Sequence, residues 1–234
     1  MTSTIPSPLP PTEKMAVMPG PILTRRDVDD PRGLVLMLHG GRADGHTPVD
    51  DRSASWRRSN WMMTHIGGRV TRADMSIWLL RYSVRGWNDQ AGPTPSPVLD
   101  ARWALEQVRR QHPDRSDLPV VLLGHSMGAR TAVAVADDPL VTGVVALAPW
   151  LLADEPNQAL AGKHLAAAHG RADKITSARQ TAEFVRRAQD VAASTELQSM
   201  GRVGHYMFRG IPAWNDFAVS RSLAFLPAPA HRPS

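Results

Sequence analysis

The chain has 234 residues, of which 42% are hydrophobic and 21% charged, values that suit one globular domain with a single core. Cysteine is absent, which excludes disulfides, thiolate metal sites and a cysteine nucleophile. The formal net charge is +5, but the basic residues are scattered and form no continuous run, so we expect no nucleic-acid partner.

No apolar stretch approaches the roughly 18 residues of a transmembrane helix, so no integral membrane segment is expected. Residues 1–11 lack the basic start and apolar run of a secretory signal, which leaves a cytoplasmic location as the default expectation. Residues 1–20 are rich in Pro, Ser and Thr and are expected to form a mobile arm. We expect residues 21–228 to form the domain and residues 229–234 a tail.

Short apolar runs alternate with amphipathic stretches along the rest of the chain. Strands are predicted at residues 21–26 (an edge strand), 33–38, 75–82, 120–123, 141–148, 164–168 and 192–199. Helices are predicted at residues 56–68, 98–111, 177–191 and 213–225, and in the alanine-rich segment after residue 128. The first should stop at Gly67-Gly68, and the second should turn Leu99, Trp103 and Val108 towards one face.

Such alternation predicts an α/β fold with a doubly wound, mostly parallel sheet and helices on both faces. The active site of such a sheet lies at the carboxyl ends of its strands. The connection at residues 151–162 is too short for a large helical cap, so an open site with a short or absent cap is expected, covered at most by the loop at residues 42–55.

One stretch organises the chain: a buried-strand pattern at residues 120–123, then Gly124-His125-Ser126-Met127-Gly128, then an alanine-rich helix pattern. This is G-x-S-x-G in the strand–turn–helix setting of a nucleophile elbow. The turn forces the serine into a strained backbone conformation, and the flanking glycines let strand and helix approach closely. Ser126 should therefore stand exposed at a strand end, with Met127 N–H beside it to stabilise a developing oxyanion.

Two later segments also place polar residues just beyond predicted strands: Asp173 in Gly170-Arg171-Ala172-Asp173, and His205 after Gly204. A serine hydroxyl is a poor nucleophile at neutral pH and needs a base such as histidine, which in turn needs an anionic partner. The chain order serine, aspartate, histidine is that of the α/β-hydrolase arrangement.

With these motifs and His39-Gly40-Gly41, residues 34–226 resemble the α/β-hydrolase superfamily, in particular small, lidless serine esterases. The resemblance implies Ser126 as nucleophile, His205 as base and Asp173 as acid. It also implies a second oxyanion donor from Gly41 N–H and a bracing role for His39 in its loop.

Competing residues remain for two of these roles. Asp154 and Glu155 compete as the acid, and we favour Asp173 because Gly-x-x-Asp after a strand is the family's usual setting. His164 and His169 compete as the base, but both lie in or beside a predicted strand, where packing in the interior is expected. His125 is expected to pack against the sheet.

Trp87 and Trp150 both follow predicted strands and are candidates for an acyl or leaving-group pocket, with a place in the core or at its rim as the alternative. A metal site built from His39, His46 and Asp50 has no supporting spacing, so neither a metal nor a cofactor is expected.

The sequence therefore predicts a serine hydrolase that cleaves small-molecule carboxylic esters with short or medium acyl groups through an acyl-enzyme. The same triad would serve a thioesterase, an amidase or peptidase, or an acyltransferase. A catalytically inactive ligand-binding or interaction module on the same fold is the alternative of another class. The oligomeric state is left open.

Overall fold

Seven strands form one sheet in the order β1-β3-β2-β4-β5-β6-β7, in a computed structural model that describes residues 20–89, 92 and 94–226. The strands are β1 (Ile22–Arg26), β2 (Gly33–Leu38), β3 (Met75–Arg81), β4 (Val120–His125), β5 (Val141–Leu147), β6 (His164–His169) and β7 (Ser194–Ser199). Only β1 is antiparallel to its neighbour, and every other pair is parallel. The expected mostly parallel sheet with an edge strand at its start is confirmed.

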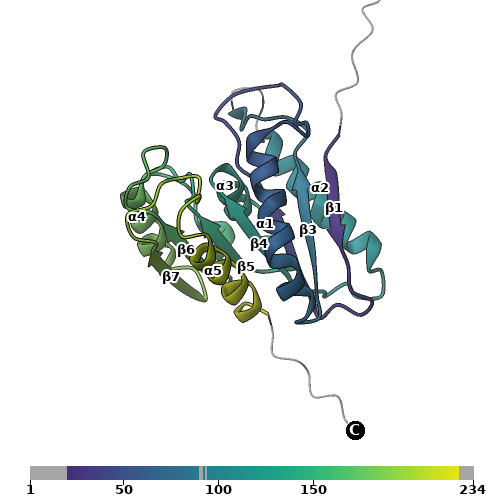
Figure 1. The fold of residues 1–234 in the computed structure, drawn as a ribbon. Helices are drawn as coiled ribbons and strands as arrows, with labels where there is room; N and C mark the ends of the chain where they lie inside the picture. Colours follow the sequence, from purple (N-terminus) through teal and green to yellow (C-terminus); the bar gives the residue numbers. More distant parts are fainter. Residues whose placement is uncertain (1–19, 90–91, 93, 227–234) are drawn as a thin grey trace, which may run out of the picture.

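Helices cover both faces of this sheet (Figure 1). They are α1 (Ala54–Thr71), α2 (Ser96–Gln111), α3 (Met127–Ala134), α4 (Ala178–Ala188) and α5 (Ile211–Ala224). One core cluster joins the sheet to α2, α3 and α4, and a second joins the opposite face to α1 and α5. The doubly wound α/β fold in a single domain is thereby confirmed.

The strand order reverses beside β2, because β3 pairs with one edge of β2 and β4 with the other. Ligands of open α/β sheets bind in the crevice outside the carboxyl ends of the strands at such a switch point. The turn after β4 contains Ser126. The topology therefore places this serine where the fold leaves room for a ligand.

The link from β5 to β6 contains only one short 3-10 helix, Gln158–Leu160, and no helical cap. The described residues include no helix long and apolar enough to cross a membrane. The predicted mobile arm at residues 1–20, except Gly20, and the tail at residues 229–234 lie outside the described residues.

Two helix predictions need correction. Helix α1 does not stop at Gly67-Gly68 but continues to Thr71, since Ile66 and Val70 are buried and outweigh the roughly 1 kcal/mol cost of each glycine. A Cβ at Gly67 would meet the Arg26 side chain, so glycine there permits close packing.

On α2, Leu99 and Trp103 are exposed by 58% and 37%, and only Val108 of the predicted set is buried. The buried stripe is Ala101, Ala104, Leu105 and Val108. This is the i, i+3, i+4, i+7 spacing of one helix face. Leu99 lies on the opposite side of the helix from Val108. The prediction chose the face that contains the largest apolar side chains. That face is exposed, because the core beside α2 is filled by small alanines instead.

Candidate active site

Ser126 lies in a sharp turn between β4 and α3, with φ 56° and ψ −118°. A positive φ strains any residue with a Cβ and is held only where the surroundings enforce it. Here the tight turn requires it, and the glycines permit the turn: a Cβ at Gly128 would meet the Leu38 carbonyl oxygen, and one at Gly124 the backbone of Ala129. The strained conformation and close approach expected for the elbow are thus present in the structure.

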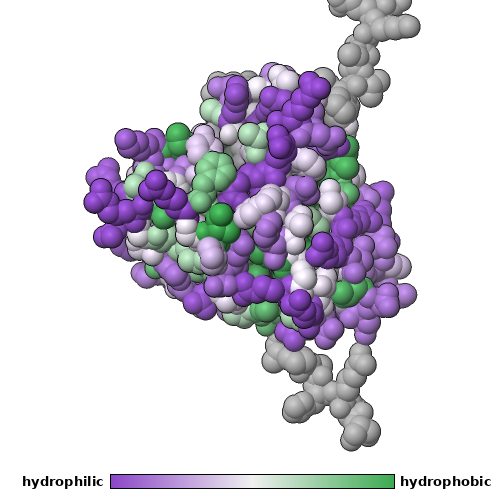
Figure 2. Space-filling view, viewed as in Figure 1, coloured by the Kyte–Doolittle hydropathy of each residue, from purple (hydrophilic) through white to green (hydrophobic). Residues whose placement is uncertain are grey.

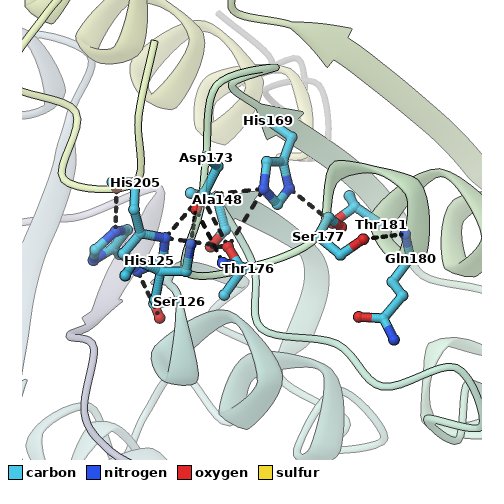
Figure 3. A network of polar contacts seen from close by, with 11 residues as sticks. His125, Ser126, Ala148, His169, Asp173, Thr176, Ser177, Gln180, Thr181 and His205 are labelled. Carbon is cyan, nitrogen blue, oxygen red and sulfur yellow. Dashed lines mark hydrogen bonds and ion pairs between the residues drawn. The ribbon is translucent and has the colours of Figure 1, made fainter.

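Three side chains from three separate strand ends meet at this turn (Figure 3). Ser126 Oγ lies 3.0 Å from His205 Nε2, and His205 Nδ1 lies 2.8 Å from Asp173 Oδ2. His205 stands in the loop between β7 and α5, and Asp173 follows β6. All three side chains are almost completely buried, and that of Asp173 is 1% exposed. The prediction that Ser126 stands exposed is therefore wrong, because the residue is only 7% exposed where the loops that carry Asp173 and His205 meet the turn. A hydroxyl, an imidazole and a carboxylate therefore form one continuous hydrogen-bonded chain.

The Asp173 carboxylate is anchored by the turn that follows it. Its Oδ1 accepts hydrogen bonds from the backbone N–H groups of Ile175 (2.8 Å) and Thr176 (2.9 Å), and its Oδ2 accepts one from the Thr176 hydroxyl (2.9 Å). Burial alone raises the pKa of Asp173, but these backbone hydrogen bonds, with that of His205, outweigh it and hold the pKa below its usual value. The carboxylate is ionised and fixed in direction.

His169 contacts the same carboxylate from the other side (Figure 3). Its Nε2 lies 3.2 Å from Asp173 Oδ2, and its Nδ1 lies 2.8 Å from the Thr181 hydroxyl. Burial lowers the pKa of His169 despite the nearby Asp173 charge. Asp173 is thus shared by two histidines, of which only His205 reaches Ser126.

His125 closes the opposite side of the serine. Its Nε2 lies 3.1 Å from the His205 carbonyl oxygen, to which Nε2–H donates, and this contact connects the elbow to the loop that carries His205. Burial, with the neighbouring His205, lowers the pKa of His125 to about 3, so the ring is neutral. Among the described residues its Nδ1 finds no hydrogen-bond partner.

A cavity of about 370 Å³ opens beside Ser126. Its floor is formed by the elbow and by Gly40 and Gly41, and its sides by the start of α1 and the turn and loop that carry Asp173 and His205. A Cβ at Gly41 would meet the Met127 side chain and the Arg85 carbonyl oxygen, so Gly41 lies directly against the elbow. Met127 N–H is the first of α3 and has no acceptor within the helix.

The sequence matches the family described as "Alpha/beta hydrolase family" over residues 35–232, which is most of the chain. The chain belongs to the alpha/beta hydrolase family. This confirms the resemblance and the fold inferred from the four motifs. A comparison with curated proteins gives no match.

Solved structures of other alpha/beta hydrolases share the fold at low sequence identity. A serine hydrolase without a lid from Xanthomonas campestris is 19% identical, with a TM-score of 0.61, covering 96% of this chain and 100% of that one. An esterase from Pyrococcus furiosus is 18% identical, with a TM-score of 0.60, over 87% and 86%. A monoacylglycerol lipase from Paleococcus ferrophilus is 13% identical, with a TM-score of 0.60, over 88% and 99%. At these identities the likeness shows the fold alone.

Within this alpha/beta hydrolase, Trp87 and Trp150 lie elsewhere than the expected pocket. Their rings pack against one another with centroids 6.3 Å apart, and the Arg130 guanidinium lies over both, 4.2 and 4.8 Å from their centroids. Arg130 in turn pairs with Glu155 at 2.7 Å. Neither tryptophan lines the cavity beside Ser126. Both rings contact the guanidinium of this buried ion pair, because a guanidinium stacks favourably on aromatic faces.

Among the described residues, neither Asp154, Glu155 nor His164 bonds to Ser126 or His205. Glu155 is occupied by Arg130, and Asp154 is exposed. His164 bonds to Ser194 and stacks on Phe225 at the far end of β6. The described residues contain no group of three or more His, Cys, Asp or Glu side chains arranged to hold a metal ion.

His39 makes the loop contacts expected of a bracing residue. Its Nδ1 lies 2.6 Å from the Gly40 carbonyl oxygen, and its Nε2 accepts the Tyr82 N–H at 3.3 Å. Burial lowers the pKa of His39 to about 4, so this ring is also neutral.

The structure assigns several residues a role in the site that the sequence did not predict for them. Arg58, Tyr206 and Phe208 line the cavity, and Thr176 and His169 hold the carboxylate. Arg58 comes from α1, about 150 residues before the loop it contacts, so no local pattern could indicate it. Thr176 does have a local signal, because a hydroxyl three residues after an aspartate can bond back to its carboxylate.

Acidification should destabilise the fold through the two buried neutral histidines, His39 and His125. Their folded-state pKa values lie below the value of about 6.5 in an unfolded chain, so the unfolded state binds protons first as the pH falls. We expect the free energy of unfolding, measured by chemical denaturation, to drop by several kcal/mol between about pH 6.5 and pH 4.

His125→Gln cannot be protonated and should lessen this fall, whereas His46→Gln on the exposed loop should not. Coincident pH–stability curves for wild type and His125→Gln would show that His125 is not a buried neutral group.

Proposed function

We propose that this alpha/beta hydrolase is a serine hydrolase that cleaves carboxylic esters of small molecules through an acyl-enzyme. The single observation that carries the proposal is the Ser126 Oγ to His205 Nε2 contact of 3.0 Å, backed by Asp173 at 2.8 Å. This geometry suits transfer of the serine proton to His205 as the serine attacks a carbonyl carbon.

In this proposal the reaction runs in two stages. Ser126 Oγ bonds to the ester carbonyl carbon, His205 takes the hydroxyl proton, and Asp173 stabilises the imidazolium and holds its tautomer. The backbone N–H groups of Met127 and Gly41 receive the oxyanion. His205 then gives the proton to the alcohol oxygen as its bond to the carbonyl carbon breaks. A water molecule, deprotonated by His205, attacks the acyl carbon, and the bond from that carbon to Ser126 Oγ breaks as His205 returns the proton to Oγ and the acid leaves.

Rates on matched acetyl compounds test the proposal and separate its alternatives. We expect p-nitrophenyl acetate to be hydrolysed with a burst of p-nitrophenol. The matched thioester, S-(p-nitrophenyl) thioacetate, and the matched amide, p-nitroacetanilide, should react at least tenfold more slowly. A faster thioester or anilide would favour a thioesterase or an amidase. Acceleration by an added alcohol, with transfer of the acetyl group to it, would favour an acyltransferase. No turnover of any of them by the folded protein would favour a binding module.

Thr176→Val removes the hydroxyl that donates to Asp173 and keeps the side-chain volume. A hydrogen bond to a charged group contributes about 1.5–3 kcal/mol. We therefore expect the free energy of unfolding to fall by about 2 kcal/mol and kcat to fall about tenfold, because the carboxylate is held less firmly. Initial rates and chemical denaturation measure the two effects.

Thr181→Val is the matched control, since its hydroxyl contacts His169 and not the carboxylate. It should lower kcat less than Thr176→Val does. A Thr176→Val enzyme with the kcat of wild type would show that the hydroxyl does not position Asp173.

A further inference from the structure

A second cavity, of about 380 Å³, adjoins the one beside Ser126. The two share three lining residues: Ala54 and Arg58 from the start of α1, and Phe208 from the loop before α5. Beyond them the second cavity is lined by Arg57, Trp61 and Ile211. The shared walls make one groove that leads from the serine along α1, and we call it the α1 groove.

The lining of the α1 groove is mostly apolar, although it lies at the surface. Trp61 is 38% exposed and Phe208 70% exposed, and Ile175 and Tyr206 stand exposed at the mouth of the inner cavity. Figure 2 shows apolar surface interrupting the polar surface between α4 and α1, where Figure 1 places the loop that leads into α5. Exposed apolar surface of this kind beside a reactive centre is typical of a ligand-binding groove.

Arg58 supplies a fixed wall to the groove, because two of its three guanidinium nitrogens donate to the chain itself, while the buried Nη1 has no hydrogen-bond partner among the described residues. Its Nε donates to the Tyr206 carbonyl oxygen at 2.8 Å and its Nη2 to the Met207 carbonyl oxygen at 3.1 Å. The guanidinium carbon lies 5.2 Å from the Trp61 ring centroid and 5.7 Å from that of Phe208. The arginine thus joins the two aromatic walls and connects α1 to the loop that carries His205.

The length of the groove follows from the helix that forms its side. Its lining runs along α1 from Ala54 to Trp61, which corresponds to about 10 Å at a rise of about 1.5 Å per residue. An extended hydrocarbon chain advances about 1.3 Å per carbon, given C–C bonds of about 1.5 Å. The part of the groove along α1 therefore accommodates roughly eight extended carbons.

We propose that the α1 groove binds a medium-length hydrocarbon chain of the ester substrate, with Trp61 and Ile211 contacting its far end. This inference rests on the proposed function and assigns its substrate class. The chain can belong either to the acyl group or to the alcohol, since both meet at the ester bond beside Ser126. An acyl chain and an alcohol chain have the same apolar chemistry. They are distinguished by the substrate series in which a change to the groove alters the chain-length preference.

The test uses two substrate series on the full chain. The acyl series compares p-nitrophenyl octanoate with p-nitrophenyl acetate, and the alcohol series compares octyl acetate with ethyl acetate by acid release. In wild type we expect kcat/KM of the eight-carbon compound to exceed that of the two-carbon compound at least tenfold in one series. Trp61→Ala removes a wall and Ile211→Trp fills the far cavity, and each should lower that ratio at least fivefold.

Trp103→Ala is the matched control, because Trp103 is 37% exposed, close to the 38% of Trp61, and lies on α2 on the other face of the sheet. It should keep the wild-type ratio. The ratio of the two kcat/KM values is taken within each variant, so a difference in the folded fraction between variants cancels. Loss of the preference in the acyl series would place the acyl chain in the groove, and loss in the alcohol series would place the alcohol there.

Two failures are distinguishable. If wild type hydrolyses the acetates but Trp61→Ala and Ile211→Trp leave both ratios unchanged, the groove does not bind the chain and the proposal is overturned while the esterase function stands. If folded wild type hydrolyses none of the four esters, the proposed function itself fails.

Discussion

Ser126→Ala and His205→Ala are each expected to lower kcat for p-nitrophenyl acetate by about 10⁴-fold or more, with the fold intact. Members of a catalytic triad act as a unit, so removal of either the nucleophile or its base removes nearly the whole effect. The double variant should be no slower than the slower single variant, since the 3.0 Å contact between the two side chains is already lost in each. A double variant slower by the product of the single losses would contradict a joint role.

Asp173→Asn should also lower kcat strongly, by up to about 10⁴-fold, because an amide cannot hold the required tautomer of His205. Circular dichroism and thermal melting would establish that the variant is folded. If Asp173→Asn kept nearly full activity, the acid would be misassigned, although Asp173 is the carboxylate that contacts His205 Nδ1 in the structure. Glu155 is already occupied by Arg130.

Glu155→Ala is expected to lower the free energy of unfolding by about 3–5 kcal/mol. The Arg130 and Glu155 side chains are only 9% and 6% exposed, and removal of the carboxylate leaves a buried guanidinium without a counter-charge between Trp87 and Trp150. For a domain of this size the loss corresponds to a Tm lower by roughly 10 °C. Chemical denaturation and calorimetry measure the change.

Glu106→Ala provides the comparison, since Glu106 pairs with the exposed Arg110 on α2. Exposed pairs contribute about 0–1 kcal/mol, so this variant should differ little from wild type. The paired exchange Arg130→Met with Glu155→Leu should be more stable than Glu155→Ala, because it leaves no charge uncompensated. Equal stability of Glu155→Ala and Glu106→Ala would show that the buried pair is not coupled.

The parts of the site that the sequence could predict are those that depend on chain order and strand ends. Apolar runs located the strands, and in a parallel sheet the residues after β4, β6 and β7 must come out at one edge. The sequence alone therefore groups Ser126, Asp173 and His205 at one site. The strain at Ser126 followed from the glycines on either side of it, since only a tight turn needs both.

The walls of the site could not be predicted, because they form where distant segments meet. Arg58 and Trp61 on α1 reach Phe208 only through the packing of the loop before α5 against that helix. Trp87 and Trp150 follow strands as a pocket residue would, yet the partner that decides their place, Arg130, is on α3. Similarly, which face of α2 is buried depends on how closely the helix packs on the sheet. The small side chains of its buried alanines permit that close packing.

Labelling with a fluorophosphonate probe tests most directly the claim that Ser126 is an activated nucleophile. The probe forms a stable phosphonyl adduct with a serine whose proton a neighbouring base removes, and intact mass followed by peptide mapping locates the adduct. We expect a single adduct on Ser126 in wild type and none in Ser126→Ala. Absence of an adduct on folded wild type, or an adduct on another residue that persists in Ser126→Ala, would contradict that claim.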